Sequence, residues 1–367
     1  MKRMLLLLLS LFFLSGTALA VGSDAIQSMQ DSAQADILAG MDGDARQILG
    51  DISLKDCTNL ATVFCTIWEN SRQATAGLIK SALFTVSKTA VVMILCGCAA
   101  GFSSSTKMPS VILTMAGALG ITAAISSDLT GMLSLCTTTA EELSAFSGSM
   151  VPVVLTAVTL CGAPTAGTMS CTATVFALNL CITLITSVLI PAVSAYIAMI
   201  TVNAALGNGM LTRLAEFVRW AVSGVLKILM TVFIGYVTVF GAVGRSIDSA
   251  TVRAAKFAMS GTIPVVGGIL SNAAETVLSS AVVLKNSVGI FGMVCVVSIC
   301  LLPFLRLGLN YLLFRTGIAI LSPICPPLLL GLMDGIVNSF RLILGMLGSC
   351  CAIVFFELVF AVVFFAP

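Results

Sequence analysis

Long apolar stretches dominate this chain beyond residue 80, and they constrain its fold more than any other feature. Several extend for about 17 to 29 residues with few or no charges, and about 20 apolar residues suffice for a helix to cross the hydrocarbon core of a bilayer. Hydrophobic residues make up 58% of the chain and charged residues only 9%, against about 25% charged in soluble domains. One core cannot bury this much apolar surface, so the sequence predicts an all-α polytopic integral membrane protein.

The apolar stretches predict about seven or eight transmembrane helices. Segment 150–161 is short and bracketed by Pro152 and Pro164, so it is either re-entrant or a span that needs neighbours. Segment 172–200 contains Pro191 and is either one long kinked helix or a broken pair, because proline removes a backbone donor. The other spans are expected at 82–102, 111–127, 224–243, 288–304, 307–320 and 342–365.

Two polar segments interrupt this series of spans. Asp128, Glu141 and Glu142 indicate a polar connection after the second span. Segment 211–222 places apolar residues on one face and charged residues on the other, which predicts an amphipathic helix lying on the membrane. Counting basic residues in the loops does not decide which faces of the membrane they occupy.

The amino terminus predicts export of the segment that follows it. Residues 1–20 resemble a cleavable signal peptide, with Lys2 and Arg3 before a short apolar core and a small-x-small site at 18–20. Residues 21–80 form an acidic, helix-rich extracytoplasmic segment. About sixty residues are marginal for independent folding, so we expect this segment to pack on the transmembrane domain, 81–367, or on a partner.

Composition excludes several classes of function. The formal net charge is +2, with no basic cluster, so nucleic-acid binding has no electrostatic support. The chain has no histidine and no phosphate-binding glycine-rich loop, so histidine-based catalysis is excluded and any ATP-driven step needs another protein. Its 13 cysteines lack metal-ligand spacing. We therefore expect no enzymatic activity, no cofactor and no metal.

The stretch 245–286 differs from the apolar spans around it. It is only moderately apolar, and Ile263, Pro264 and Gly267 lie in an IPVVGG sequence that stops any helix. Residues recur at helical spacing on both sides of this break. The stretch therefore predicts an amphipathic helix, a break and a second helix, lying on or dipping into the membrane.

The same stretch resembles the stage III sporulation protein AE family. The resemblance rests on the order and spacing of four short motifs over roughly forty residues, and extends more loosely over most of the chain. The position of Glu275 is more often Asp in that family. The motifs are Ala255-Lys256-Phe257, Ile263 to Gly267, Ala273 to Val277 and Leu284-Lys285-Asn286.

This resemblance implies a function in endospore formation. The chain would be a membrane-embedded subunit of a secretion-like channel complex that links mother cell and forespore and is needed for forespore development after engulfment. The implied partners are the other subunits of the stage III sporulation A complex, including a separate ATPase, together with membrane lipids and a membrane insertase. The implied location is the mother-cell-derived outer forespore membrane, with the amino-terminal segment in the intermembrane space.

Three charged residues inside the apolar stretches are further site candidates: Arg306, Arg315 and Glu357. Charges at membrane depth are costly and face a cavity or a partner. Arg315 and Glu357 could pair between helices, either as a neutralising pair or as part of a polar path, whereas the depth of Asp334 is open.

Two other function classes remain open at this point. A secondary transporter would place a midplane site at the broken segments near Pro191 and Pro264. An intramembrane enzyme would need paired catalytic residues at depth, and the sequence offers one clearly deep carboxylate, Glu357.

Overall fold

The computed structural model describes residues 28, 30–50, 52–53, 60–103, 110–160, 164–206, 211–262 and 267–363. Every regular element in these ranges is a helix, which confirms the all-α prediction. The predicted signal peptide, Ile263 and Pro264 lie outside the described residues. After a first helix over 30–39, the elements are α2 (Gly43–Leu49), α3 (Leu60–Ser103), α4 (Ser110–Leu160), α5 (Pro164–Leu184), η2 (Ile185–Leu189), α6 (Ile190–Leu206), α7 (Thr212–Thr262), α8 (Gly267–Leu321) and α9 (Pro327–Val363).

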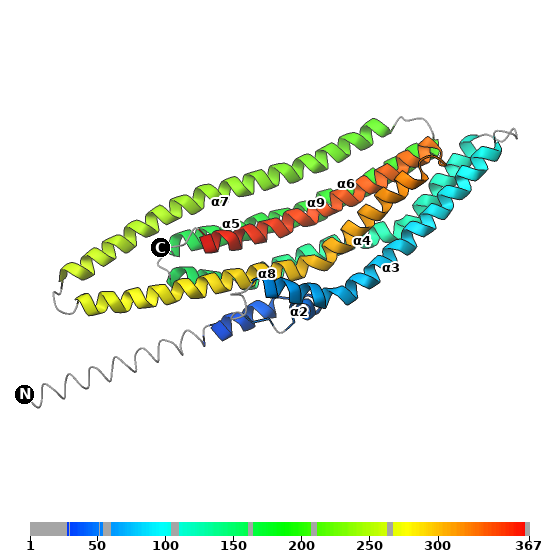
Figure 1. The fold of residues 1–367 in the computed structure, drawn as a ribbon. Helices are drawn as coiled ribbons and strands as arrows, with labels where there is room; N and C mark the ends of the chain where they lie inside the picture. Colours follow the sequence, from blue (N-terminus) through cyan, green and yellow to red (C-terminus); the bar gives the residue numbers. More distant parts are fainter. Residues whose placement is uncertain are drawn as a thin grey trace, which may run out of the picture.

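The long helices form one elongated bundle (Figure 1), and α9 lies at its centre. Helix α8 runs antiparallel to α9 and places Gly292 against Leu358. Helix α4 runs parallel to α9, and the thiol of Cys136 lies 3.9 Å from the carbonyl oxygen of Ile343. Helices α5 and α6 pack on other sides of α9 and α7 runs along the outside, so the core is where α4, α5, α8 and α9 meet.

Six helices in the described residues are long and apolar enough to cross a membrane. The sequence suggested seven or eight because two pairs of expected spans are each joined in one helix. Segments 111–127 and 150–160 both belong to α4, and 288–304 and 307–320 both belong to α8. In the structure, 150–160 is therefore not a re-entrant segment. No polar connection separates it from 111–127, because α4 is continuous over both.

The joined helices continue through features that suggested interruptions. Asp128, Glu141 and Glu142 are exposed or half-buried on the side of α4, where acids do not break a helix. Pro152 lies inside α4 and Pro303 inside α8. Neighbouring helices can compensate for the backbone hydrogen bonds that an internal proline removes from a membrane helix.

Segment 172–200 forms one continuous helical run rather than a broken pair. Its irregularity is the π-helical segment η2, which ends two residues before Pro191. A single π turn inside an α-helix leaves backbone groups shifted in register and is frequent at functional positions.

The IPVVGG sequence lies between two of the longest helices. Helix α7 ends at Thr262 and α8 begins at Gly267, and they contain 51 and 55 residues. Two long helices therefore lie on either side of residues 263–266, which are outside the described residues, and the predicted break there stays a prediction. The amphipathic segment expected on the membrane at 211–222 is the first part of α7 rather than a separate helix.

The amino-terminal segment packs on the bundle, as its small size suggested. Ile37 and Leu49 are buried, and Gly40 lies directly against Ser149 of α4. Because six crossings are an even number, the start of α3 and the end of α9 lie at the same end of the bundle (Figure 1). The end of α4, the start of α5 and the α7–α8 break share that end, whereas the α6–α7 and α8–α9 connections lie at the other.

Candidate functional site

A cavity of about 610 Å³ lies between α6, α7, α8 and α9, near the α8–α9 connection. We call it the polar cleft. Its walls combine small and apolar residues with charged, amide and phenol side chains. The polar and charged side chains in its lining are Tyr196, Asn203, Thr212, Glu216, Arg219, Arg315, Asp334 and Asn338.

An ion pair links α8 and α9 at one side of the polar cleft. Arg315 Nη1 lies 3.5 Å from Asp334 Oδ1, and the two side chains are 62% and 53% exposed. Helices α8 and α9 form an antiparallel hairpin, which explains this pairing. Arg315 lies six residues before the end of α8 and Asp334 lies seven residues after the start of α9. The suggested pairing of Arg315 with Glu357 is wrong, because 23 residues of helix put Glu357 about 35 Å from Asp334 along α9.

Hydrogen bonds join the end of α6 to the start of α7 on the opposite side of the cleft. Asn203 Nδ2 donates to Thr212 Oγ1 at 3.0 Å, and the backbone N–H of Leu211 donates to Asn203 Oδ1 at 3.2 Å. These bonds satisfy groups at a helix terminus that the helix itself leaves unpaired. They also fix where Glu216 and Arg219, one and two turns later, enter the cleft.

Tyr196 forms the inner wall of the cleft. It is 4% exposed and lies beside Asn338, with Arg219, Glu216 and Arg341 close enough to interact electrostatically. The cleft thus contains two guanidinium groups, two carboxylates and several uncharged polar groups within apolar helices. Such an arrangement can solvate a polar segment or a small hydrophilic solute.

A second set of candidates is buried at the other end of the bundle. Lys285 and Glu357 are each 2% exposed, and the side-chain oxygen of Asn286 is buried and accepts no hydrogen bond from the described atoms. Since Gly292 lies against Leu358, the antiparallel α8 and α9 place all three residues at this end. Buried charges of both signs are costly in a membrane protein and are retained where they serve a structural or functional purpose.

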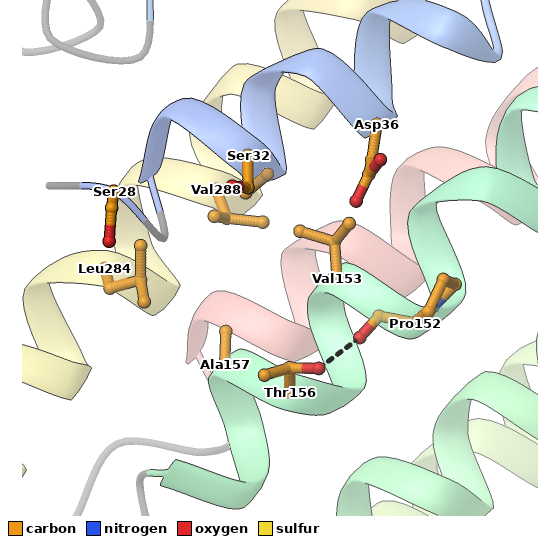
Figure 2. A pocket seen from close by; sticks show the side chains of 10 residues that line it. Ser28, Ser32, Asp36, Pro152, Val153, Thr156, Ala157, Leu284 and Val288 are labelled. Carbon is orange, nitrogen blue, oxygen red and sulfur yellow. Dashed lines mark hydrogen bonds between the residues drawn. The ribbon is translucent and has the colours of Figure 1, made fainter. Parts of the chain in front are cut away.

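The amino-terminal helix covers this end of the bundle. Figure 2 shows Ser28, Ser32 and Asp36 facing α4 and α8 across a cavity of about 270 Å³. The opposite wall is mostly apolar and includes Val153 and Val288, together with the hydroxyl-bearing Thr156. The helix therefore closes the α4–α8 seam directly beside Lys285.

Among the remaining predicted residues, the structure describes only the side chain of Arg306. Arg306 is exposed on α8, and its carbonyl oxygen accepts a hydrogen bond from Asn310 at 2.8 Å. Lys256, Gly267 and Glu275 lie in α7 or α8, but only their backbone is described.

Sequence reasoning missed a cluster of cysteines in the core. Cys181 of α5 and Cys350 of α9 have their sulfur atoms 3.4 Å apart, and Cys300 of α8 interacts with Cys351. These thiols are free, and no group of three or more His, Cys, Asp or Glu residues in the described part of the chain is placed to hold a metal. No sequence signal connects them, because they come from helices far apart in the chain.

Comparison with known proteins places the chain in a family. Residues 58–366 match the family model described as stage III sporulation protein AE. A relative with that name, from Bacillus subtilis (strain 168), is 25% identical over 184 residues, which are 50% of this chain and 46% of the relative. The match thus spans about half the length of that relative. No solved structure matches. Because the family model covers most of the chain, this multi-pass membrane protein belongs to the stage III sporulation protein AE family.

Proposed function

We propose that this protein is a membrane-embedded subunit of the channel complex that links mother cell and forespore, and that forespore development after engulfment depends on it. The family gives the protein a role in sporulation. The observation that carries the more specific proposal is the polar cleft, with the Arg315–Asp334 ion pair at its side, within an apolar bundle. A subunit that borders a hydrophilic path needs such a surface, whereas a purely structural bundle does not.

The polar cleft would then be the part of this subunit that contacts the transported material or the neighbouring channel subunits. The positive charges of its two arginines equal the negative charges of its two carboxylates. The cleft can therefore contact groups of either charge and does not select a solute of one sign. Energy for transport would come from a separate ATPase, since the chain has no phosphate-binding loop of its own. The other proposed partners are the remaining subunits of the stage III sporulation A complex and a membrane insertase.

The proposed location is the mother-cell-derived outer forespore membrane. If the amino-terminal segment is exported into the intermembrane space, the end of the bundle that it covers faces that space. The α7–α8 break and the end of α9 lie at this same end. The polar cleft, at the opposite end, would then face the mother-cell cytoplasm.

A deletion and complementation series in the native sporulating organism tests this proposal. We expect the deletion strain to complete engulfment, after which the forespore shrinks and a late forespore-specific transcription reporter fails. Arg315→Asp should reproduce this defect, and the exchanged pair Arg315→Asp/Asp334→Arg should restore part of the activity. Glu69→Gln, which removes an exposed ion pair with Arg72 in α3, is the matched control.

Two results would count against the channel proposal. Normal spores from a deletion strain without a second gene copy would remove the developmental role. Full complementation by Arg315→Asp, at protein levels equal to the unmodified chain, would show that the polar cleft is not part of the functional surface.

A secondary transporter is the second candidate, and one observation favours it. The π-helical segment at Ile185–Leu189, just before Pro191, is a local irregularity within a membrane-spanning run, and irregular helices form the midplane sites of many transporters. Uptake into vesicles that contain only this protein would support the transporter. Transport that requires the other complex subunits would support the channel subunit instead.

A further inference from the structure

A second cavity lies between α7 and α9, separate from the polar cleft, and we call it the basic groove. Its volume is about 590 Å³, within the range of roughly 300–1,000 Å³ that is usual for small-molecule sites. Leu226, Met230 and Leu342 provide apolar walls, and Gly345 leaves room because it has no side chain. Lys227 and Arg341 are the charged residues in its lining.

The charge in the basic groove has one sign, unlike that of the polar cleft. No acidic residue occurs among the described residues that line it. The α7 and α9 helices run parallel with Leu226 beside Gly345, which puts Lys227 and Arg341 within about 8 Å of each other along the bundle axis. On α7 the acid that precedes Lys227 is Glu216, which lies in the polar cleft, about 16 Å from Lys227 and about 9 Å from the level of Arg341 by helical rise.

The surface around the groove is apolar and exposed. Ile228 and Val232 of α7 are 65% and 64% exposed, and Trp220 is 70% exposed. In a membrane such side chains contact lipid acyl chains. The groove is therefore an opening in a lipid-facing surface with two cations in its lining.

We propose that the basic groove binds an anionic phospholipid. Lys227 and Arg341 would hold the phosphate, Arg341 by paired N–H donors and Lys227 as a point charge, while an acyl chain lies along Leu226, Met230 and Leu342. Basic pockets between transmembrane helices are a recurring kind of site for anionic lipid head groups. A neutral lipid would bring no net charge to the two cations, and free phosphate would leave the apolar walls uncovered.

Trp220 provides a local reporter for this site. It lies three residues before Ser223 and seven before Lys227, so it shares the groove-side face of α7. The chain has two tryptophans, so Trp68→Phe leaves Trp220 as the single tryptophan, which can be excited selectively over tyrosine. This full-length chain would be reconstituted in phosphatidylcholine vesicles with increasing fractions of brominated phosphatidylglycerol or, in a parallel series, brominated phosphatidylcholine.

We expect brominated phosphatidylglycerol to quench Trp220 at a lower fraction of total lipid than brominated phosphatidylcholine does. Each cation near a membrane surface contributes a factor of about five to anionic-lipid affinity. The preference for phosphatidylglycerol is the ratio of the phosphatidylcholine fraction to the phosphatidylglycerol fraction needed for equal quenching. Lys227→Gln and Arg341→Gln should each reduce this preference by about fivefold, and together by up to roughly 30-fold. Lys80→Gln, which removes an exposed cation on α3, should leave the preference unchanged.

A variant that keeps both charges separates binding in the groove from general attraction of anionic lipid. A Cβ atom at Gly345 would lie 3.6 Å from Leu226 Cδ1, so Gly345→Leu fills the groove and should also abolish the preference. Circular dichroism of each variant shows whether it keeps its helix content, and the comparison uses only variants that do.

Several results would overturn the proposal. One is equal quenching by the two brominated lipids, and another is a preference that survives the double substitution. Loss of the preference on adding inorganic phosphate would assign the groove to a free anion. A change in oligomer mass on Lys227→Gln/Arg341→Gln, with no lipid preference in any variant, would assign it to an acidic partner helix.

Discussion

Helices α7 and α8 have similar lengths and are joined by four residues, yet they are used in opposite ways. In α8, 61% of the most apolar window is buried within the protein, whereas in α7 the share is 11%. Helix α8 packs against α3, α4 and α9, while α7 lies on the outside of the bundle. Apolar composition alone therefore does not make a core helix in a membrane protein. Helix α8 is surrounded by other helices, whereas α7 packs on α5, α6 and α9 along one face and leaves its other face to lipids or other subunits.

The largest expected difference between the two helices is in the cost of removing an aromatic ring. Phe291 of α8 is 0% exposed, and Phe217 of α7 is 60% exposed. Phe291→Ala should reduce the free energy of unfolding by about 3–5 kcal/mol, because it leaves a cavity. Phe217→Ala should change it by less than about 0.5 kcal/mol. Unfolding by a denaturing detergent, followed by circular dichroism, measures both, and equal costs would contradict the distinction.

A smaller effect is expected from adding atoms to each helix. A Cβ atom on Gly292 of α8 would clash with Met150 and lie 3.1 Å from Leu358 Cδ1, whereas one on Gly235 of α7 would meet nothing within 4 Å. Gly292→Val should therefore cost about 1–3 kcal/mol. Gly235→Ala should instead raise the free energy of unfolding by about 0.5–1 kcal/mol, because glycine is unfavourable inside a helix. A cost at Gly235 would mean that α7 has a packed neighbour there.

The smallest effect concerns the end of α8, where the core helix reaches the polar cleft. The Arg315–Asp334 pair is more than half exposed on both sides, so a double-mutant cycle with Arg315→Gln and Asp334→Asn should give a coupling of about 0.2–1 kcal/mol. Raising the salt concentration should reduce this coupling. A coupling of several kcal/mol would mean that the pair is shielded from water in the membrane.

The sequence predicted those features of the fold that depend on nearby residues. Apolar runs located the membrane helices. The sequence did not predict that α4 continues from Ser110 to Leu160. Acids such as Asp128 make a segment polar and so suggest a loop, but they do not stop a helix. Counting spans from hydropathy treats 111–127 and 150–160 as two separate helices, although one continuous helix contains both.

The candidate sites were harder to predict because they are assembled from distant segments. Arg315 was recognised as a charge at depth, but its partner depended on reading residues 322–326 as the turn of a hairpin, which places Asp334 opposite. The cysteine contacts and the basic groove depend on which helices are neighbours. Neither periodicity nor composition contains that information for a single sequence.

The length of α7 has a mechanical consequence. Its apolar sequence ends near Val243, but the helix continues for 19 more residues to Thr262, a rod of about 28 Å. Helix α8 returns beside this rod, so the α7–α8 hairpin can act as a lever whose fulcrum is the membrane surface. A tilt of about ten degrees at the fulcrum would move the tip of such a rod sideways by about 5 Å. Small rearrangements where α7 leaves the membrane would then be amplified into larger displacements at the far end of the hairpin.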